Sequence, residues 1–177
     1  MLTTLLAVPA VILIAGLAAG QPWRWGIRPS GDISAKLLIA ALAISPLRTL
    51  FAGSNLLKWL EGERRTIGIA AFFYASLHLV IFAASIGRLD WIIQGMAFAS
   101  MWTGWVAFGL LAIVASISNS ALRVRLGFWW KRLQRLTIPA AVLVLAHWLL
   151  LTRSPLEALL HFAPLVALRL LAYQRRR

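Results

Sequence analysis

The chain contains no cysteine, and only five of its 177 residues are acidic. The absence of cysteine excludes disulfides, iron–sulfur clusters and every site that needs a thiolate. The acidic residues are Asp32, Glu61, Glu63, Asp90 and Glu157. Four fall in predicted loops and the fifth at a predicted helix end, so no carboxylate pair is expected in a bilayer core. This argues against a proton pump built on carboxylates.

Several catalytic motifs are also missing from the sequence. It has no phosphate-binding Walker loop, no HExxH zinc motif, no GxSxG nucleophile motif and no dinucleotide fingerprint. Any nicotinamide donor would therefore need a separate flavoprotein.

Long apolar runs dominate what is present. Hydrophobic residues make up 61% of the chain and charged residues 13%, against roughly half and a quarter in soluble proteins. Six runs are close to the length of about 20 residues that a spanning helix needs. The sequence predicts one domain over residues 1–177, an all-α integral membrane bundle of six transmembrane helices. The predicted helices cover residues 2–19, 34–52, 66–86, 95–117, 133–152 and 155–173.

The net charge of +13 comes from 18 Lys and Arg residues. Such an excess also occurs in nucleic-acid-binding proteins, but here the cations flank apolar runs, which favours a lipid bilayer as the partner and no nucleic acid. Most of them fall on one side of the predicted topology. The other side holds Arg24, Arg28, Lys36, Arg88 and Arg153. The richer side is expected to be cytoplasmic, which places both termini in the cytoplasm and the protein in the bacterial inner (plasma) membrane.

The first predicted helix is expected to be retained, although Ala18, Ala19 and Gly20 look slightly like a signal-peptidase site. No Lys or Arg precedes its apolar run, whereas a cleaved signal peptide normally begins with one.

All three histidines, His78, His147 and His161, lie inside apolar runs. Ionisable residues at membrane depth are functional candidates, and a neutral imidazole is a good axial ligand for heme iron. Counted from the outer helix ends at 1.5 Å per residue, their depths are about 12, 8 and 9 Å, which are indistinguishable. A hydrogen bond to a neighbouring helix is the alternative role for each.

Short motifs along the chain resemble a known family. The matching stretches are residues 31–38, 45–48, 64–68, 76–79, 116–120, 126–127, 130–133 and 146–148. In their order and spacing they resemble the heme-binding membrane subunit of the periplasmic methionine sulfoxide reductase system, within the ferric reductase-like transmembrane superfamily.

The resemblance implies an electron-transfer subunit rather than the place where substrate reacts. Such a subunit takes electrons from a cytosolic flavin reductase or a membrane quinol and passes them through b-type heme to a periplasmic molybdopterin reductase. The family's histidines match His78 and His147, which are expected to be the axial ligands of one heme near the periplasmic face. His161 is the rival ligand, because its depth also fits.

One departure from the family concerns the cytoplasmic side. The family pattern Trp-x-x-Leu-His reads here with Gln134 in place of the histidine, and glutamine is not an expected heme ligand. The sequence therefore predicts a single heme, with FMN as an alternative cofactor on that side.

Basic residues supply two further expectations. Lys36 or Arg153 is expected to pair with a heme propionate near the outer face. A second group is expected at the cytoplasmic interface, where some members dock an anionic flavin or a donor protein and topology alone explains the rest. This group is Arg48, Arg64, Arg65, Lys131 and Arg132.

Two other classes of function remain open from the residues alone. One is a small transporter or channel whose histidines bind substrate or gate the path, and the other is a structural membrane subunit without a cofactor. The lack of buried carboxylates and of a repeated half argues against the transporter.

The uneven distribution of basic residues predicts the topology. A reporter that is active only in the cytoplasm, fused after Arg177, is expected to be active, because the richer basic side stays inside. The measurement is the activity of this fusion beside that of a reporter that works only in the periplasm. Activity of the periplasmic reporter instead would overturn the topology.

Overall fold

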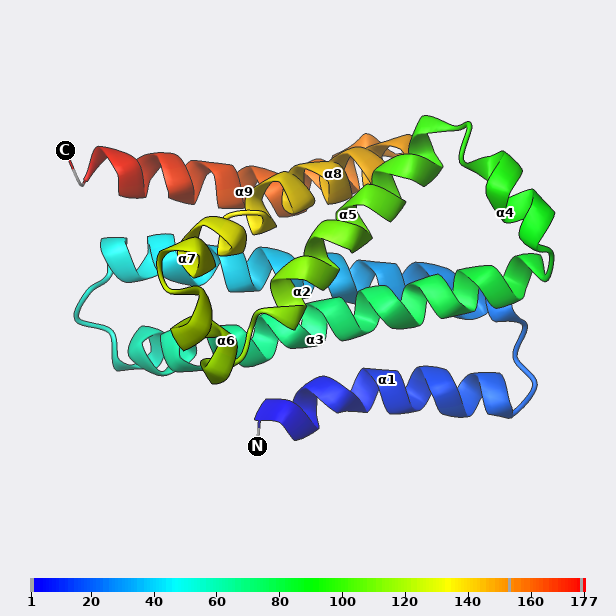
Figure 1. Ribbon diagram of the computed structural model, residues 1–177, viewed down its shortest axis with the longest axis horizontal. Helices are drawn as coiled ribbons and strands as arrows, with labels where there is room; N and C mark the ends of the chain where they lie inside the picture. The colour runs from blue at the N-terminus through cyan, green and yellow to red at the C-terminus, as the bar shows by residue number, and fades with distance from the viewer. Residues whose placement is uncertain (1, 153, 176) are drawn as a thin grey trace.

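The computed structural model describes residues 2–152, 154–175 and 177, and within them all regular structure is helical (Figure 1). This agrees with the expected all-α class. The helices are α1 (Leu2–Ala18), α2 (Trp23–Leu50), α3 (Asn55–Ile86), α4 (Leu89–Gly95), α5 (Ala99–Ser116), α6 (Ser120–Leu126), α7 (Phe128–Gln134), α8 (Thr137–Leu151) and α9 (Pro155–Gln174).

Among the described residues, five helical stretches are long and apolar enough to cross a membrane. They are α2, α3, α5, the consecutive pair α7 and α8, and α9. Helix α1 has 17 residues and is therefore about 26 Å long, against a hydrocarbon core of about 30 Å. The chain is thus a multi-pass membrane bundle, and by length the expected six spans are corrected to five with a shorter apolar α1.

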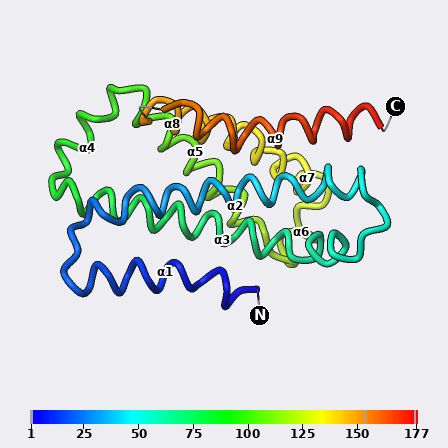
Figure 2. Tube along the Cα trace, turned by 180° about the vertical axis from the view of Figure 1, so that it is seen from behind, coloured from blue at the N-terminus to red at the C-terminus, as the bar shows by residue number. Residues whose placement is uncertain are grey.

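The helices form antiparallel pairs. Helices α2 and α3 make the most extensive pairing, and α5 packs on α8 in the second pair. Helix α9 packs against α2, while α1 lies along the outside of the α2–α3 pair and makes fewer contacts (Figures 1 and 2). The loop between α2 and α3, helices α6 and α7, and the C-terminus gather toward one end of the bundle, and α4 lies at the other.

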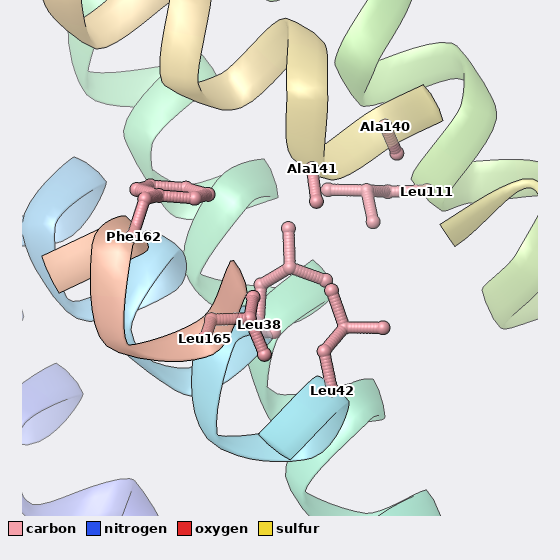
Figure 3. Close-up of a cluster of buried hydrophobic side chains, with 8 residues drawn as sticks. Leu38, Leu42, Leu111, Ala140, Ala141, Phe162 and Leu165 are labelled. Atoms are coloured by element: carbon pink, nitrogen blue, oxygen red, sulfur yellow. The ribbon is translucent and has the colours of Figure 1, made fainter. Parts of the chain in front are cut away.

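Leucine, alanine and phenylalanine side chains form the main core where α2, α3, α5, α8 and α9 meet (Figure 3). The cluster consists of Leu38, Leu42, Ala71, Leu111, Ala140, Ala141, Phe162 and Leu165. Ala71 and Ala140 are fully buried. Because small residues let helix backbones approach closely, these alanines bring α3 and α8 against the leucines of α2 and α5.

Two helices begin earlier than the sequence predicted. Helix α2 starts at Trp23 rather than at residue 34, and α3 starts at Asn55 rather than at residue 66. The added turns of α2 carry charged residues and Pro29, so a search for long apolar runs does not include them. Contacts with α3 support these turns instead. The added turns of α3 begin at Ser54, whose hydroxyl accepts a hydrogen bond from the Leu57 N–H at 3.3 Å.

The predicted single helix over residues 133–152 is interrupted. Helix α7 ends at Gln134 and α8 starts at Thr137. Pro139 is the third residue of α8, and a proline has no N–H for the carbonyl four residues earlier and clashes with it. That carbonyl belongs to Arg135, so the break falls where the proline predicts it.

A short helix replaces the expected loop after α3. Helix α4 follows Gly87, whose φ of 68° ends α3 in the left-handed region. At its start Arg88 pairs with Asp90 at 2.6 Å. This contact holds the pKa of the Asp90 carboxyl below its usual range.

One interior hydrogen bond ties α1 to the bundle. The Tyr74 hydroxyl in α3 donates to the Leu6 carbonyl in α1 at 2.7 Å, and Tyr74 is 1% exposed. Tyr74 packs there against Ala10 and Leu13. This interior contact compensates for the small area that α1 buries.

We expect Tyr74→Phe to loosen α1, because it removes the donor and leaves the ring in place. The expected loss is about 1 kcal/mol in the free energy of unfolding, measured by thermal unfolding in detergent. Tyr173→Phe is the control, since among the described residues the Tyr173 hydroxyl only accepts a hydrogen bond from the exposed Arg177. Equal stabilities of the two variants would contradict this role of Tyr74.

Candidate functional site

His78 in α3 and His147 in α8 face each other across the interior. Their ring centroids lie 6.5 Å apart and their ring planes are nearly perpendicular, at 85°. They come from different antiparallel pairs, α2–α3 and α5–α8, so the histidines meet where the two pairs face each other. Sequence depth alone indicated similar levels in the membrane, and the fold brings these two rings together.

Each of the two rings is oriented by a backbone carbonyl on its neighbouring helix. The His78 Nδ1–H donates to the Ile27 carbonyl of α2 at 2.8 Å. The His147 Nδ1–H donates to the Ser100 carbonyl of α5 at 2.5 Å. A carbonyl can only accept, so in a neutral ring the proton lies on Nδ1 and the lone pair on Nε2. No hydrogen bond from the described residues occupies either Nε2.

A glycine lies under each ring, four residues after the carbonyl that orients it. A Cβ at Gly31 would lie 3.1 Å from the Cε1 and Nδ1 atoms of His78. A Cβ at Gly104 would lie 2.6 Å from Cε1 of His147 and 2.8 Å from its Nδ1. A Cβ at Gly104 would clash with the His147 ring and one at Gly31 would press on the His78 ring, so the two glycines allow this close approach.

A cavity of about 710 Å³ surrounds the histidine pair. This volume lies within the range of roughly 300–1,000 Å³ found for ligand sites. Most of the lining is apolar or aromatic and comes from α2, α3, α5 and α8. Among the lining residues are Ala35, Ala75, Leu79, Phe82, Met101, Trp105, Ala107, Phe108, Leu111, Val144, Trp148 and Leu151.

One end of the cavity is polar. Arg28 and Asp32 of α2 and Glu157 of α9 line it. Arg28 contacts Glu157 at 2.6 Å and Asp32 at 3.7 Å. The sequence placed Asp32 in a loop, but α2 carries it to the cavity wall. A ligand with an apolar body and charged groups at one edge would match this division.

The spacing of the histidines fits a metal held between them. Two metal–nitrogen bonds of about 2 Å, with each ring centre about 1 Å beyond its nitrogen, give about 6 Å between centroids. The observed separation is 6.5 Å. Perpendicular ring planes are compatible with this, because each ring can rotate about its own metal–nitrogen bond.

With only the two histidine nitrogens as donors, the site favours a metal that brings its other ligands with it. Within residues 2–152, 154–175 and 177, no group of three or more His, Cys, Asp or Glu side chains is placed to hold a metal. A tetrahedral zinc site needs three or four protein ligands. Two imidazoles across a wide apolar cavity instead fit a flat metal macrocycle such as heme.

His161 occupies a different position. It lies in α9, its Nδ1–H donates to the Glu157 carbonyl in its own helix at 2.8 Å, and its ring lies 5.5 Å from that of Trp148. It is not among the residues that line the cavity. The structure therefore separates His161 from the pair formed by His78 and His147.

Lys36 and Arg153 are the two residues that the sequence predicted as partners of a heme propionate near the outer face. Lys36 is exposed on α2 and does not line the cavity, while Arg153 lies outside the described residues. Sequence reasoning missed Arg28, which does line the cavity. It also missed Gly104, although an isolated glycine inside an apolar helix can indicate a close approach.

The cations expected at the cytoplasmic interface separate into three settings. Arg48 of α2 contacts Glu61 at 3.1 Å and also donates to the Ala52 carbonyl. Arg64 and Arg65 lie in α3. Lys131 and Arg132 lie in α7, where Arg132 sits over aromatic rings.

Gln134, which replaces the histidine of the family pattern, forms a hydrogen bond within the protein. Its Nε2 donates to the Ser118 hydroxyl at 3.1 Å, which joins the end of α7 to the residues after α5. The position therefore has a packing role in this chain.

Comparison with known proteins agrees with this architecture. The family model "Ferric reductase like transmembrane component" matches residues 30–153, which include His78 and His147. No solved structure matches the chain.

Several curated relatives carry one name, protein-methionine-sulfoxide reductase heme-binding subunit MsrQ. The protein from Rhodospirillum rubrum is 33% identical, covering 93% of this chain and 81% of the relative. The protein from Caulobacter vibrioides is 31% identical, covering 79% and 67%. The protein from Bordetella pertussis is 29% identical, covering 96% and 92%. This chain therefore belongs to the ferric reductase-like transmembrane family, and within it to the group of MsrQ subunits.

Proposed function

We propose that this protein is a membrane electron-transfer subunit that holds one b-type heme between His78 and His147. The facing histidines in the cavity are the observation that carries the proposal. Their free Nε2 atoms supply two axial ligands, and the apolar walls suit the macrocycle. The relatives named as heme-binding subunits support the same assignment.

Bound heme would supply a carrier for single electrons. Ligation by two histidines leaves no open position on the iron, which suits electron relay rather than oxygen activation. The hydrogen bonds to the Ile27 and Ser100 carbonyls fix each ring and increase the basicity of its Nε2. The aromatic and aliphatic part of the lining would limit water around a bound heme, because it offers water few hydrogen-bonding partners.

The polar end of the cavity would receive the heme propionates. Arg28 supplies a cation in the cavity lining, and its contact with Glu157 holds it at this end. We therefore place Arg28 ahead of Lys36 as the propionate partner. Arg153 remains the prediction made from sequence.

The proposed electron path runs outward through the inner membrane. The histidine pair lies toward the end of the bundle that holds α4, and most basic residues lie toward the other end, which we assign to the cytoplasm. On this orientation the heme is near the periplasmic face. The acceptor would be a periplasmic molybdopterin enzyme that reduces methionine sulfoxide, in line with the relatives' names.

The electron donor would be a cytosolic flavin reductase or a membrane quinol. Arg64 and Arg65 are the docking candidates for a flavin reductase or for FMN. Arg48 is a weaker candidate, because Glu61 already pairs with it. Since Gln134 replaces the family's histidine and bonds Ser118, we propose one heme and no second heme on this side.

Replacing either proposed ligand is expected to abolish the low-spin heme spectrum. His78→Ala and His147→Ala each leave the iron with one protein ligand, so we expect a high-spin species or loss of heme. The measurement is the dithionite-reduced minus oxidised difference spectrum of the purified protein, with heme content assayed separately. His161→Ala is the control and should keep the low-spin spectrum. A colourless wild-type protein would favour a transporter or a structural subunit instead.

The glycine beneath His147 gives a second test. Gly104→Ala places a methyl group within 2.6 Å of the His147 ring, so the ring must move off its ligating position. We expect at least half of the bound heme to be lost, or its low-spin bands to be replaced. Gly109→Ala is the matched control, because it lies in the same helix and a Cβ there meets open space. Identical heme spectra in the two variants would refute the proposed geometry.

A further inference from the structure

A strongly basic bend links α5 to α8. It comprises α6, the turn at Gly127, α7 and Arg135, and is called here the basic elbow (residues 120–135). Five exposed cations belong to it: Arg123, Arg125, Lys131, Arg132 and Arg135. The sequence has no acidic residue between Asp90 and Glu157, and among the described residues no ion pair includes any of these five cations. Their charge is therefore not neutralised within the described part of the chain.

Large apolar side chains are exposed between these cations. Val124 is 84% exposed, Phe128 67% and Trp129 60%. The Arg132 guanidinium lies 4.5 Å from the Phe128 ring centroid and 5.1 Å from that of Trp129. Exposed aromatics beside cations are typical of segments that lie in the interface of a membrane, where the rings enter the headgroup layer and the cations meet phosphates.

The elbow is fixed to the end of the spanning bundle. The Trp130 indole N–H donates to the Ile117 carbonyl at 3.1 Å, and Gln134 donates to Ser118. At Gly127 the chain reverses with a φ of 48°. These contacts hold α6 and α7 as a compact bend where α5 ends and α8 begins (Figures 1 and 2). The cations are thereby kept toward the end of the bundle that also holds the α2–α3 loop and the C-terminus.

We propose that the basic elbow binds the headgroups of anionic phospholipids. Two independent features select this partner. Five cations without an acidic neighbour complement a negative surface, and each basic residue near such a surface contributes about fivefold to binding. The exposed Val124, Phe128 and Trp129 side chains would insert beside the headgroups. An acidic protein partner would account for the cations, but it would not account for the exposed apolar side chains between them.

The test compares phospholipids on the purified full-length protein. Native mass spectrometry counts the molecules of phosphatidylglycerol and phosphatidylcholine retained from an equimolar mixture in detergent. The wild-type protein is expected to retain phosphatidylglycerol at least about tenfold more strongly. The variant Arg123→Gln/Arg125→Gln/Arg132→Gln should lose most of this preference. Lys131 and Arg135 stay in place so that the membrane orientation is kept.

The matched control removes three exposed cations on the sparsely basic side of the predicted topology, in the variant Arg24→Gln/Lys36→Gln/Arg88→Gln. Its preference should stay within about twofold of the wild type, because these charges lie outside the elbow. A second variant, Val124→Ser/Trp129→Ser, keeps every charge and should also weaken phosphatidylglycerol retention. Circular dichroism and elution as a single species check that each variant is folded.

Three outcomes would overturn the proposal. The first is equal loss of phosphatidylglycerol in the control and in the elbow variant, which would indicate net charge alone. The second is displacement of the lipid by soluble glycerol phosphate at matched concentration, which would indicate a phosphate site without a membrane role. The third is unchanged phosphatidylglycerol retention in the elbow variant, with loss of binding to an acidic flavoprotein donor. Each readout is independent of heme, so failure here leaves the proposed electron transfer intact.

Discussion

Two hydrogen bonds between antiparallel helices fix the geometry of the interior. In each, a histidine Nδ1–H donates to the carbonyl of a neighbouring helix, at Ile27 for His78 and at Ser100 for His147. These bonds determine which nitrogen faces the cavity and how each ring is turned. In each case a glycine four residues after the carbonyl lets the ring lie against the helix backbone. This arrangement of carbonyl, glycine and histidine occurs once in the α2–α3 pair and once in the α5–α8 pair. The two pairs therefore place equivalent imidazoles opposite each other.

The packing around this site combines tight and open layers. Alanines let α3 and α8 approach the leucines of α2 and α5 in the main core. At the histidine level the α2–α3 and α5–α8 pairs stand apart and enclose a cavity of about 710 Å³. A flat ligand between the two helix pairs would contact one pair with each face. It therefore needs space between the pairs and close packing within each pair, so that no helix is displaced from its partner.

The two ends of the bundle differ in whether their charged side chains form ion pairs. At the α4 end Arg28 forms ion pairs with both Asp32 and Glu157 at the cavity wall. At the opposite end the basic elbow has no acidic partner among the described residues. Paired charges are compatible with a partly buried ligand edge, whereas unpaired cations are stable beside water and phosphate. The proposed heme site and the proposed lipid surface are therefore separated along the bundle.

The sequence by itself determined the helical class, most apolar spans and the three candidate histidines. Apolar length and the positions of Lys and Arg carry this information, because the bilayer constrains them residue by residue. Helix starts at Trp23 and Asn55 were missed, since polar turns of helix are held by contacts rather than by lipid. The resemblance favoured His78 with His147, but only the tertiary structure shows that these two rings face each other while His161 contacts Trp148. Similar depth is visible in a sequence, but the direction in which a helix turns a side chain depends on its packing partners.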